Sequence, residues 1–262
     1  MKHRVIYYYD ELNDDFGGTG ISARRIGGDF PFVHDSLPWR ICAFILYYLV
    51  ALPIVFAVNR VWYGVRIKNR HVLKNLKNGF FLYGNHTQHF ADATMPSLLA
   101  FPRKAYVVAS PDAASINGVC WLVQMLGGLI LPNELSGMRG FVKAVKRRCD
   151  EKQAVAIYPE AHIWPYYTGI RPFSSASFVY PVKNDLPAVA FVTTYRKRLF
   201  RKLPPALTVT LSEPFYRDPS LNERDARENL RGQVYGFMRR QAENNEVEHI
   251  LYIKKEKETS QK

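Results

Sequence analysis

The longest apolar stretch of the chain runs from residue 41 to residue 58 and contains no charged side chain. As a helix rising about 1.5 Å per residue, it would be roughly 27 Å long, close to the ~30 Å hydrocarbon core of a bilayer. Arginine and tryptophan occur on both sides of the stretch, which is typical of membrane interfaces. The pattern predicts a membrane-associated helical element over residues 36–62.

Polar and helix-breaking residues occur within this apolar stretch. Pro53 lies inside it, and Tyr47 and Tyr48 lie near its middle. Because proline removes a hydrogen bond from a helix interior, a kinked, re-entrant or single-leaflet element fits as well as a straight span. A buried hairpin of a soluble core is the remaining interpretation.

Short apolar runs alternate with helix-like patterns through residues 63–250, which are expected to form the main domain. Strands are predicted at residues 80–84, 105–109, 129–131, 154–158, 187–194 and 207–211. Helices are predicted at residues 118–125 and 135–145, and Ser220 with Glu223 forms a capping box ahead of a last long helix. This alternation predicts an α/β fold with a mixed sheet covered by helices.

The two ends of the chain lack such periodicity. Residues 1–35 contain clustered tyrosines, acidic residues and glycine pairs, and are expected to form an irregular arm on the main domain. Residues 251–262 form a predominantly polar tail that is expected to fray.

The charge balance indicates an anionic partner. The formal net charge is +13, which suits an anionic membrane surface or a phosphorylated or acidic substrate or carrier. No nucleic-acid-binding signature accompanies it, so nucleic acid is not an expected partner. The three cysteines form no C-x-x-C pair, which argues against a disulfide scaffold and a thiolate zinc site.

Polar side chains follow two of the predicted strands. Asn85 and His86 come directly after residues 80–84, with Asp92 close behind, and Glu160 follows residues 154–158. In open α/β sheets, ligands bind in the crevice beyond the carboxyl ends of the strands. His86 is therefore the first candidate for a functional side chain.

Four short blocks carry a resemblance to a known family. They are Asn85-His86 followed by Asp92, Gly127-Gly128-Leu129-Ile130-Leu131, Tyr158-Pro159-Glu160-Ala161 and Leu186-Pro187-Ala188-Val189. In content, order and spacing they resemble the four blocks of the glycerolipid acyltransferase family, of the 1-acylglycerol-3-phosphate acyltransferase type. The resemblance covers roughly residues 40–215.

The sequence departs from the family pattern in three places. Five residues separate His86 from Asp92, where the family usually has four, so the pair would need a bulged turn. The arginines that the family places in its second and third blocks are absent from the matching positions. Arg139 and Arg171 lie nearby in the sequence and are the candidates to bind a substrate phosphate, since guanidinium groups bind phosphate bidentately.

The resemblance implies transfer of a fatty acyl group from acyl-CoA or an acyl carrier protein to a lysophospholipid hydroxyl. The most direct acceptor is 1-acylglycerol-3-phosphate, giving phosphatidic acid. His86 would be the general base, a role worth ~10²- to 10⁴-fold in rate, and Asp92 would orient its imidazole. The family's third-block glutamate matches Glu160, which is expected near the acceptor.

The resemblance further implies partners and a location. No metal or bound cofactor is required, because the thioester is a co-substrate. Membrane lipid, the lysophospholipid acceptor and an acyl carrier protein are the expected partners, with the enzyme at the cytoplasmic face of a membrane. Residues 121–126 are an apolar segment suited to lining an acyl-chain tunnel or to plain core packing.

Two other functions remain open at this stage. His86, His89 and Asp92 have a spacing that could present metal ligands on one side of a helical turn, with His162 as a fourth, which would suit a metal-dependent hydrolase. A non-enzymatic membrane-surface binding protein would need only the basic charge and the apolar element.

Overall fold

The computed structural model describes residues 4–18, 20–115, 118–198 and 203–256. Within these residues, a seven-stranded sheet has the order β2-β8-β7-β3-β6-β4-β5. Its strands are β2 (Arg66–Lys68), β3 (Phe80–Gly84), β4 (Ala105–Ala109), β5 (Gly128–Ile130), β6 (Ala154–Ile157), β7 (Ala188–Arg196) and β8 (Ala206–Leu211). Neighbouring strands are parallel except for the antiparallel pair β7 and β8. The predicted mixed sheet is confirmed.

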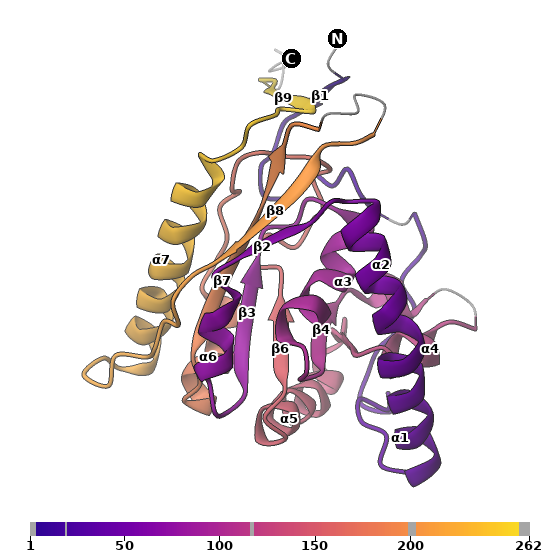
Figure 1. The fold of residues 1–262 in the computed structure, drawn as a ribbon. Helices are drawn as coiled ribbons and strands as arrows, with labels where there is room; N and C mark the ends of the chain where they lie inside the picture. The colour runs from indigo at the N-terminus through magenta and orange to yellow at the C-terminus, as the bar shows by residue number, and fades with distance from the viewer. Residues whose placement is uncertain (1–3, 19, 116–117, 199–202, 257–262) are drawn as a thin grey trace, which may run out of the picture.

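Helices cover both faces of this sheet (Figure 1). One face packs on α3 (His89–Ala100) and on the 3₁₀ turn η2 (Arg70–Asn75). The other face packs on α5 (Leu135–Asp150), α6 (Val179–Asn184) and α7 (Glu223–Ala242). The molecule is therefore a three-layer α/β/α sandwich.

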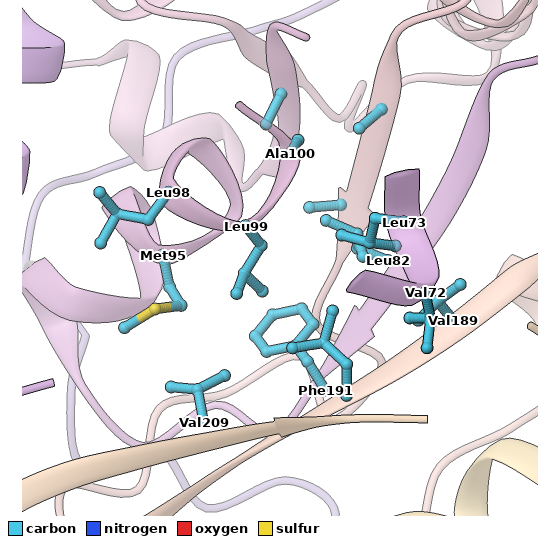
Figure 2. Packing of buried hydrophobic residues seen from close by; sticks show 14 of the residues in the cluster. Val72, Leu73, Leu82, Met95, Leu98, Leu99, Ala100, Val189, Phe191 and Val209 are labelled. Carbon is cyan, nitrogen blue, oxygen red and sulfur yellow. The ribbon is translucent and has the colours of Figure 1, made fainter. Parts of the chain in front are cut away.

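The central strand shows why both faces are covered. In β3, Phe80 and Leu82 belong to the core under α3, whereas Phe81 and Tyr83 belong to the core under α5 and α7. Side chains alternate between the two faces of a strand, and a strand that is apolar at every position must bury both. Figure 2 shows the first of these cores, with Leu99 of α3 beside Phe191 of the sheet.

Helix α7 begins differently from the prediction. Its N-cap is Asn222, whose side-chain oxygen accepts a hydrogen bond from the Asp225 backbone N–H at 3.0 Å. The hydroxyl of Ser220 instead bonds to Asp218 at 2.6 Å. The Ser220–Glu223 capping box is therefore wrong, because a nearer asparagine satisfies the first turn.

The apolar stretch forms one continuous helix from Leu37 to Val61, which excludes the predicted alternative of a buried hairpin. It comprises α1 (Leu37–Phe44), the π-helical segment η1 (Ile45–Ala51) and α2 (Leu52–Val61). Pro53 occupies the first turn of α2, directly after the wide turns of η1. A proline is tolerated at that point because its missing N–H falls where the regular hydrogen-bond pattern already changes.

The ends of the chain pair with each other in a way that the sequence pattern did not predict. Strand β1 (Arg4–Tyr8) runs parallel to β9 (Ile250–Lys254) in a separate two-stranded sheet (Figure 1). Residues expected in an irregular arm and in a polar tail thus form strands. The last part of that tail, residues 257–262, lies outside the described residues.

The remaining short elements connect these layers. They are the 3₁₀ turns η3 (Pro111–Ala114) and η4 (Ala176–Phe178) and the helix α4 (Cys120–Met125), which replaces the slightly longer helix predicted there.

Candidate active site

The carboxyl ends of β3 and β6 lie side by side, because the two strands are parallel neighbours with Tyr83 opposite Ile157. The segments that follow them carry His86 and Glu160. The main-chain N–H of His86 lies 3.4 Å from Glu160 Oε2. The two blocks, which are distant in sequence, therefore meet at one edge of the sheet.

His86 and Asp92 form a hydrogen-bonded pair. His86 Nδ1 lies 2.9 Å from Asp92 Oδ2. Asp92 is 1% exposed, while the His86 side chain is 18% exposed. With the proton on Nδ1 and directed to the carboxylate, Nε2 is the basic nitrogen of the imidazole.

The start of α3 explains how the five-residue spacer is accommodated. Gln88 is the N-cap of this helix, and Asp92 stands in its first turn. Asp92 Oδ2 reaches back to accept the backbone N–H groups of Thr87 at 2.6 Å and Gln88 at 2.8 Å. One carboxylate oxygen thus holds both the turn and the imidazole, and its negative charge is favoured near a helix N-terminus.

Tyr158, at the end of β6, contacts both His86 and Asp92. Its ring stacks on the His86 imidazole with centroids 4.5 Å apart, and its hydroxyl donates to the Asp92 main-chain oxygen at 2.5 Å. Burial raises the pKa of Tyr158 well above its ordinary value, so the phenol remains a neutral donor. Tyr158 had no predicted role, although an aromatic residue at a strand end beside the candidate glutamate was a signal for one.

Asn85 fixes the backbone just before His86. Its side-chain amide donates to Thr193 O at 3.0 Å and accepts from Thr193 N–H at 2.8 Å. The amide thus continues the hydrogen-bonding between β3 and β7 by one step beyond the strand. This second positioning residue was also not assigned a role from the sequence.

Glu160 is buried with Arg171. Glu160 is 4% exposed, the Arg171 side chain is fully enclosed, and Nε lies 3.5 Å from Glu160 Oε2. The guanidinium also donates to the main-chain oxygens of Glu160 and His162 and lies over the Trp164 ring. Burial raises the pKa of Glu160 to about 7, although Arg171 opposes the shift.

The two arginines predicted to bind a substrate phosphate differ in their exposure to solvent. Arg171 lies beneath Glu160 with no exposed guanidinium surface, whereas Arg139 is exposed on α5. The structure therefore brings His86, Asp92, Glu160 and Arg171 together, and it leaves Arg139 outside this cluster.

The candidate metal ligands do not converge. His89 is exposed, and its Nε2 lies 3.0 Å from Gly17 O in the N-terminal arm. His162 Nδ1 lies 3.5 Å from Asp15 Oδ2. Throughout the part of the chain that the structure describes, no three His, Cys, Asp or Glu side chains are grouped to hold a metal ion.

An apolar cavity of about 310 Å³ lies between the long N-terminal helix and the sheet. The long helix, α3 and the strand β4 contribute the lining residues Tyr47, Ala51, Leu52, Val55, Ala93, Thr94, Ser97, Val107 and Ala109. The segments that follow β4 contribute Ala113, Val123, Leu126, Gly127 and Gly128. Ala93 is the neighbour of Asp92 in the chain. Of residues 121–126, Val123 and Leu126 line this cavity, whereas Trp121 is exposed.

A solved structure has a similar fold. The 1-acyl-sn-glycerophosphate (LPA) acyltransferase PlsC from Thermotoga maritima superposes with a TM-score of 0.54 over 74% of this chain and 79% of that chain, at 16% identity. The chain shares the fold of this solved structure. No protein-family model and no curated protein sequence matches this chain. The predicted resemblance to the glycerolipid acyltransferase fold is thus confirmed by the structural comparison, although the sequence comparisons find no match.

Proposed function

We propose that this chain transfers a fatty acyl group from a thioester to the hydroxyl of a lysophospholipid, most directly 1-acylglycerol-3-phosphate. The observation that carries the proposal is the 2.9 Å contact between His86 and Asp92 at the edge of this sheet. The fold shared with PlsC supports the same reaction class. The donor is acyl-CoA or an acyl carrier protein thioester.

The chemistry follows from the His86–Asp92 pair. A neutral alcohol that keeps its proton is a poor nucleophile, so His86 Nε2 accepts the hydroxyl proton as the oxygen attacks the thioester carbonyl. The buried Asp92 carboxylate stabilises the imidazolium that forms. Collapse of the tetrahedral intermediate breaks the carbon–sulfur bond, forms the ester and releases the thiol, which receives the proton from His86.

The first turn of α3 is suited to stabilise the tetrahedral oxyanion. Backbone N–H groups at a helix start have no partner inside the helix and point toward negative charge. Asp92 engages the N–H groups of Thr87 and Gln88, just ahead of the helix. The N–H groups of the following residues, 89–91, are the candidates for this role.

The acyl chain fits the apolar cavity beside α3. The cavity lining is almost entirely apolar, and it includes Ala93, the residue that follows Asp92 in the chain. Burying methylene groups there is worth about 0.8 kcal/mol each. The cavity therefore supports a long-chain donor rather than a short polar one.

The acceptor is expected on the Glu160 side of the pair. Because Arg171 is enclosed and hydrogen-bonded to main-chain oxygens, we infer that it holds Glu160 and the following loop in place rather than touching substrate. Arg139 is exposed in the second turn of α5, which follows β5 and so begins at the same edge of the sheet as His86. It remains the candidate for the acceptor phosphate.

The long N-terminal helix supports a membrane location, which we place at the cytoplasmic face. Only 22% of its most apolar window is buried, and Leu49, Ile45 and Ile54 are exposed. The opposite side of the helix lines the apolar cavity, so it is committed to the domain. A helix held in this way can enter one leaflet while the domain stays at the surface.

The experiment offers acyl thioester and lysophosphatidate to the wild type, to His86→Ala and to His89→Ala. His89 is the matched control because it is an exposed imidazole three residues away, bonded to the arm. We expect phosphatidate formation to fall ~10²- to 10⁴-fold in His86→Ala and to change little in His89→Ala. Equal product from His86→Ala and the wild type would remove the proposal.

A control without acceptor separates the alternatives. Thioester release that needs no lysophosphatidate, and that depends on His89 and on a metal found in the purified protein, would favour the hydrolase. Absence of turnover in every arm would favour a binding protein.

A further inference from the structure

A second cleft lies at the opposite edge of the sheet from His86. Its volume is about 390 Å³. Lys104 and Gln153 line it, and they directly precede β4 and β6, so the cleft lies at the amino ends of these strands. The full lining is Phe32, His34, Trp39, Arg40, Ala43, Phe44, Tyr48, Lys104, Tyr106, Gln124, Gly128, Leu129, Arg147, Arg148, Glu151 and Gln153.

Cations outnumber carboxylates in this lining. Four of the side chains are Arg or Lys, and Glu151 is the acidic one. Arg147 pairs with Glu151 at 3.0 Å and with Asp35, outside the lining, at 2.5 Å. Arg148 Nη1 shares Glu151 at 2.8 Å. Two carboxylates therefore face four cations.

Two of the arginines in the cleft lining have a guanidinium group or donor atom that is not paired within the described part of the chain. Among the described residues, Arg40 has no ion-pair partner, and its side chain is exposed. Arg148 Nε is buried and has no hydrogen-bond partner. A buried donor without a partner costs free energy, and an anion in the cleft would supply the missing acceptor.

Lys104 adds a partly buried ammonium. Its Nζ lies 4.7 Å from the Tyr47 ring centroid and 5.3 Å from that of Tyr106, and it donates to Met125 O at 2.6 Å. Burial, and then the neighbouring Arg148, lower the pKa of Lys104 to about 8. A nearby anion would favour its charged form.

The mouth of the cleft adjoins the apolar helix. Trp39, Arg40 and Phe44 come from α1, and Trp39 stacks on His34 with centroids 3.8 Å apart. The same helix turns also expose Leu37 and Ile41. Tryptophan and arginine beside exposed aliphatic side chains are typical of a position at the level of lipid headgroups.

We propose that this cleft binds the phosphate of an anionic phospholipid headgroup at the membrane surface. The arginines and Lys104 bind the phosphate oxygens, and the aromatic side chains of the cleft lining pack on the glycerol region. The lipid tails lie along the exposed face of α1. The proposal shares the membrane location with the transferase function but does not depend on acyl transfer. A free soluble phosphate ester offers the same anion without tails, so the test includes it.

The first experiment measures binding of the full chain to vesicles of phosphatidylcholine, with and without phosphatidylglycerol, by cosedimentation. The variants are Arg40→Gln and Lys104→Gln, with Lys143→Gln as the matched control, since Lys143 is exposed on α5 and does not line the cleft. We expect each lining variant to lose roughly fivefold in affinity for the phosphatidylglycerol vesicles, as a juxtamembrane cation is worth about 1 kcal/mol. Neutral vesicles should bind all three alike.

The result that overturns the proposal is an equal loss in all three variants, because that is nonspecific attraction to a charged surface. No loss in Arg40→Gln overturns it as well, since this exposed side chain can be removed without unfolding the chain. Thermal melting of Lys104→Gln verifies that this half-buried change leaves the fold intact.

A second measurement distinguishes the lipid from a soluble ligand. Trp39 lines the cleft, so its fluorescence should change when a ligand binds there. Comparison with Trp39→Phe gives the part of the protein's tryptophan fluorescence that comes from Trp39. Phosphatidylglycerol vesicles should change this signal at far lower phosphate concentration than glycerol 3-phosphate or inorganic phosphate. Saturation by glycerol 3-phosphate at the same concentration would overturn the assignment to a lipid.

Discussion

The Tyr158 ring lies against the His86 imidazole, with the ring centroids 4.5 Å apart and the ring planes inclined by 19°. The same phenol donates a hydrogen bond to Asp92 O at 2.5 Å. A single side chain at the end of β6 therefore sets the plane of the imidazole and anchors the helix turn that carries the carboxylate. One substitution can remove the hydrogen bond alone, and a second can remove both contacts.

Tyr158→Phe keeps the ring and removes the hydrogen bond, whereas Tyr158→Ala removes both. We expect Tyr158→Phe to keep kcat within about tenfold, since one neutral hydrogen bond contributes ~0.5–1.5 kcal/mol. Tyr158→Ala should lose ~3–5 kcal/mol of stability through the cavity and lower kcat much further. Steady-state kinetics with chemical denaturation separate the two effects. Equal kcat in both variants would show that the ring does not orient His86.

Asp92→Asn tests the role of the carboxylate charge at nearly constant shape. Asp92 Oδ2 accepts from His86 and from two backbone N–H groups, so an amide would present a donor to a donor or leave one unpaired. We expect kcat to fall about 10²- to 10⁴-fold, because the imidazolium loses its counter-charge. Asp150→Asn, an exposed carboxylate on α5, is the control. A variant with unchanged kcat would exclude Asp92 from catalysis.

The sequence was sufficient for the elements whose boundaries are sharp. The runs at residues 80–84 and 105–109 match β3 and β4 end to end, because each is a short apolar segment with a polar, charged or breaking residue next to it. Two polar blocks at strand ends then located the His86 edge. The family resemblance, and not the spacing, implied that His86 and Asp92 would meet. The reversal of Asp92 onto the preceding turn explains how the longer spacer still permits it.

The sequence was insufficient where the outcome depends on partners distant along the chain. Pairing of β1 with β9 joins segments about 240 residues apart, and neither has a pattern that names the other. The burial of Arg171 beneath Glu160 depends on how the loop after β6 folds over Trp164. An arginine expected at a substrate surface therefore became part of the supporting structure.

Glu160→Gln should change how stability depends on pH. Burial raises the pKa of Glu160 to about 7 in the folded chain, above its ordinary value of 4.5. The group therefore stabilises the fold below about pH 4.5, and this contribution is lost as the pH rises through about 7. Relative to Glu160→Gln, which cannot titrate, the wild type should lose stability across that interval.

Thermal unfolding of both proteins between pH 4.5 and 8 measures this difference. Glu213→Gln, on an exposed side chain, is the matched control. A constant difference between the wild type and Glu160→Gln at all pH values would show that Arg171 outweighs burial and keeps the carboxylate ionised.

Under the proposed acyl transfer, Ala51→Leu should shorten the acyl chain that the protein accepts. Ala51 lines the apolar cavity of about 310 Å³, whereas Ala57 is exposed on the same helix. Each methylene that no longer fits loses about 0.8 kcal/mol, or roughly fourfold in kcat/KM for that donor. Competition between long and short acyl thioesters should therefore shift toward short chains in Ala51→Leu and stay unchanged in Ala57→Leu. An unaltered profile in Ala51→Leu would place the acyl chain elsewhere.

Leu49→Lys tests whether the exposed face of the long helix enters a membrane. Leu49 is 65% exposed in the π-helical segment, so a lysine there disturbs little of the domain packing. In a bilayer the same change costs up to ~2.5–3.5 kcal/mol at the centre of a spanning helix, and less where lysine can extend its ammonium to the surface. Flotation with neutral phosphatidylcholine vesicles should therefore recover at least several-fold less Leu49→Lys than wild type. Leu135→Lys, 92% exposed on α5 and away from this helix, should float like the wild type. If both lysines had the same effect, the helix would be a surface of the soluble domain, and membrane recruitment would depend on the basic charge alone.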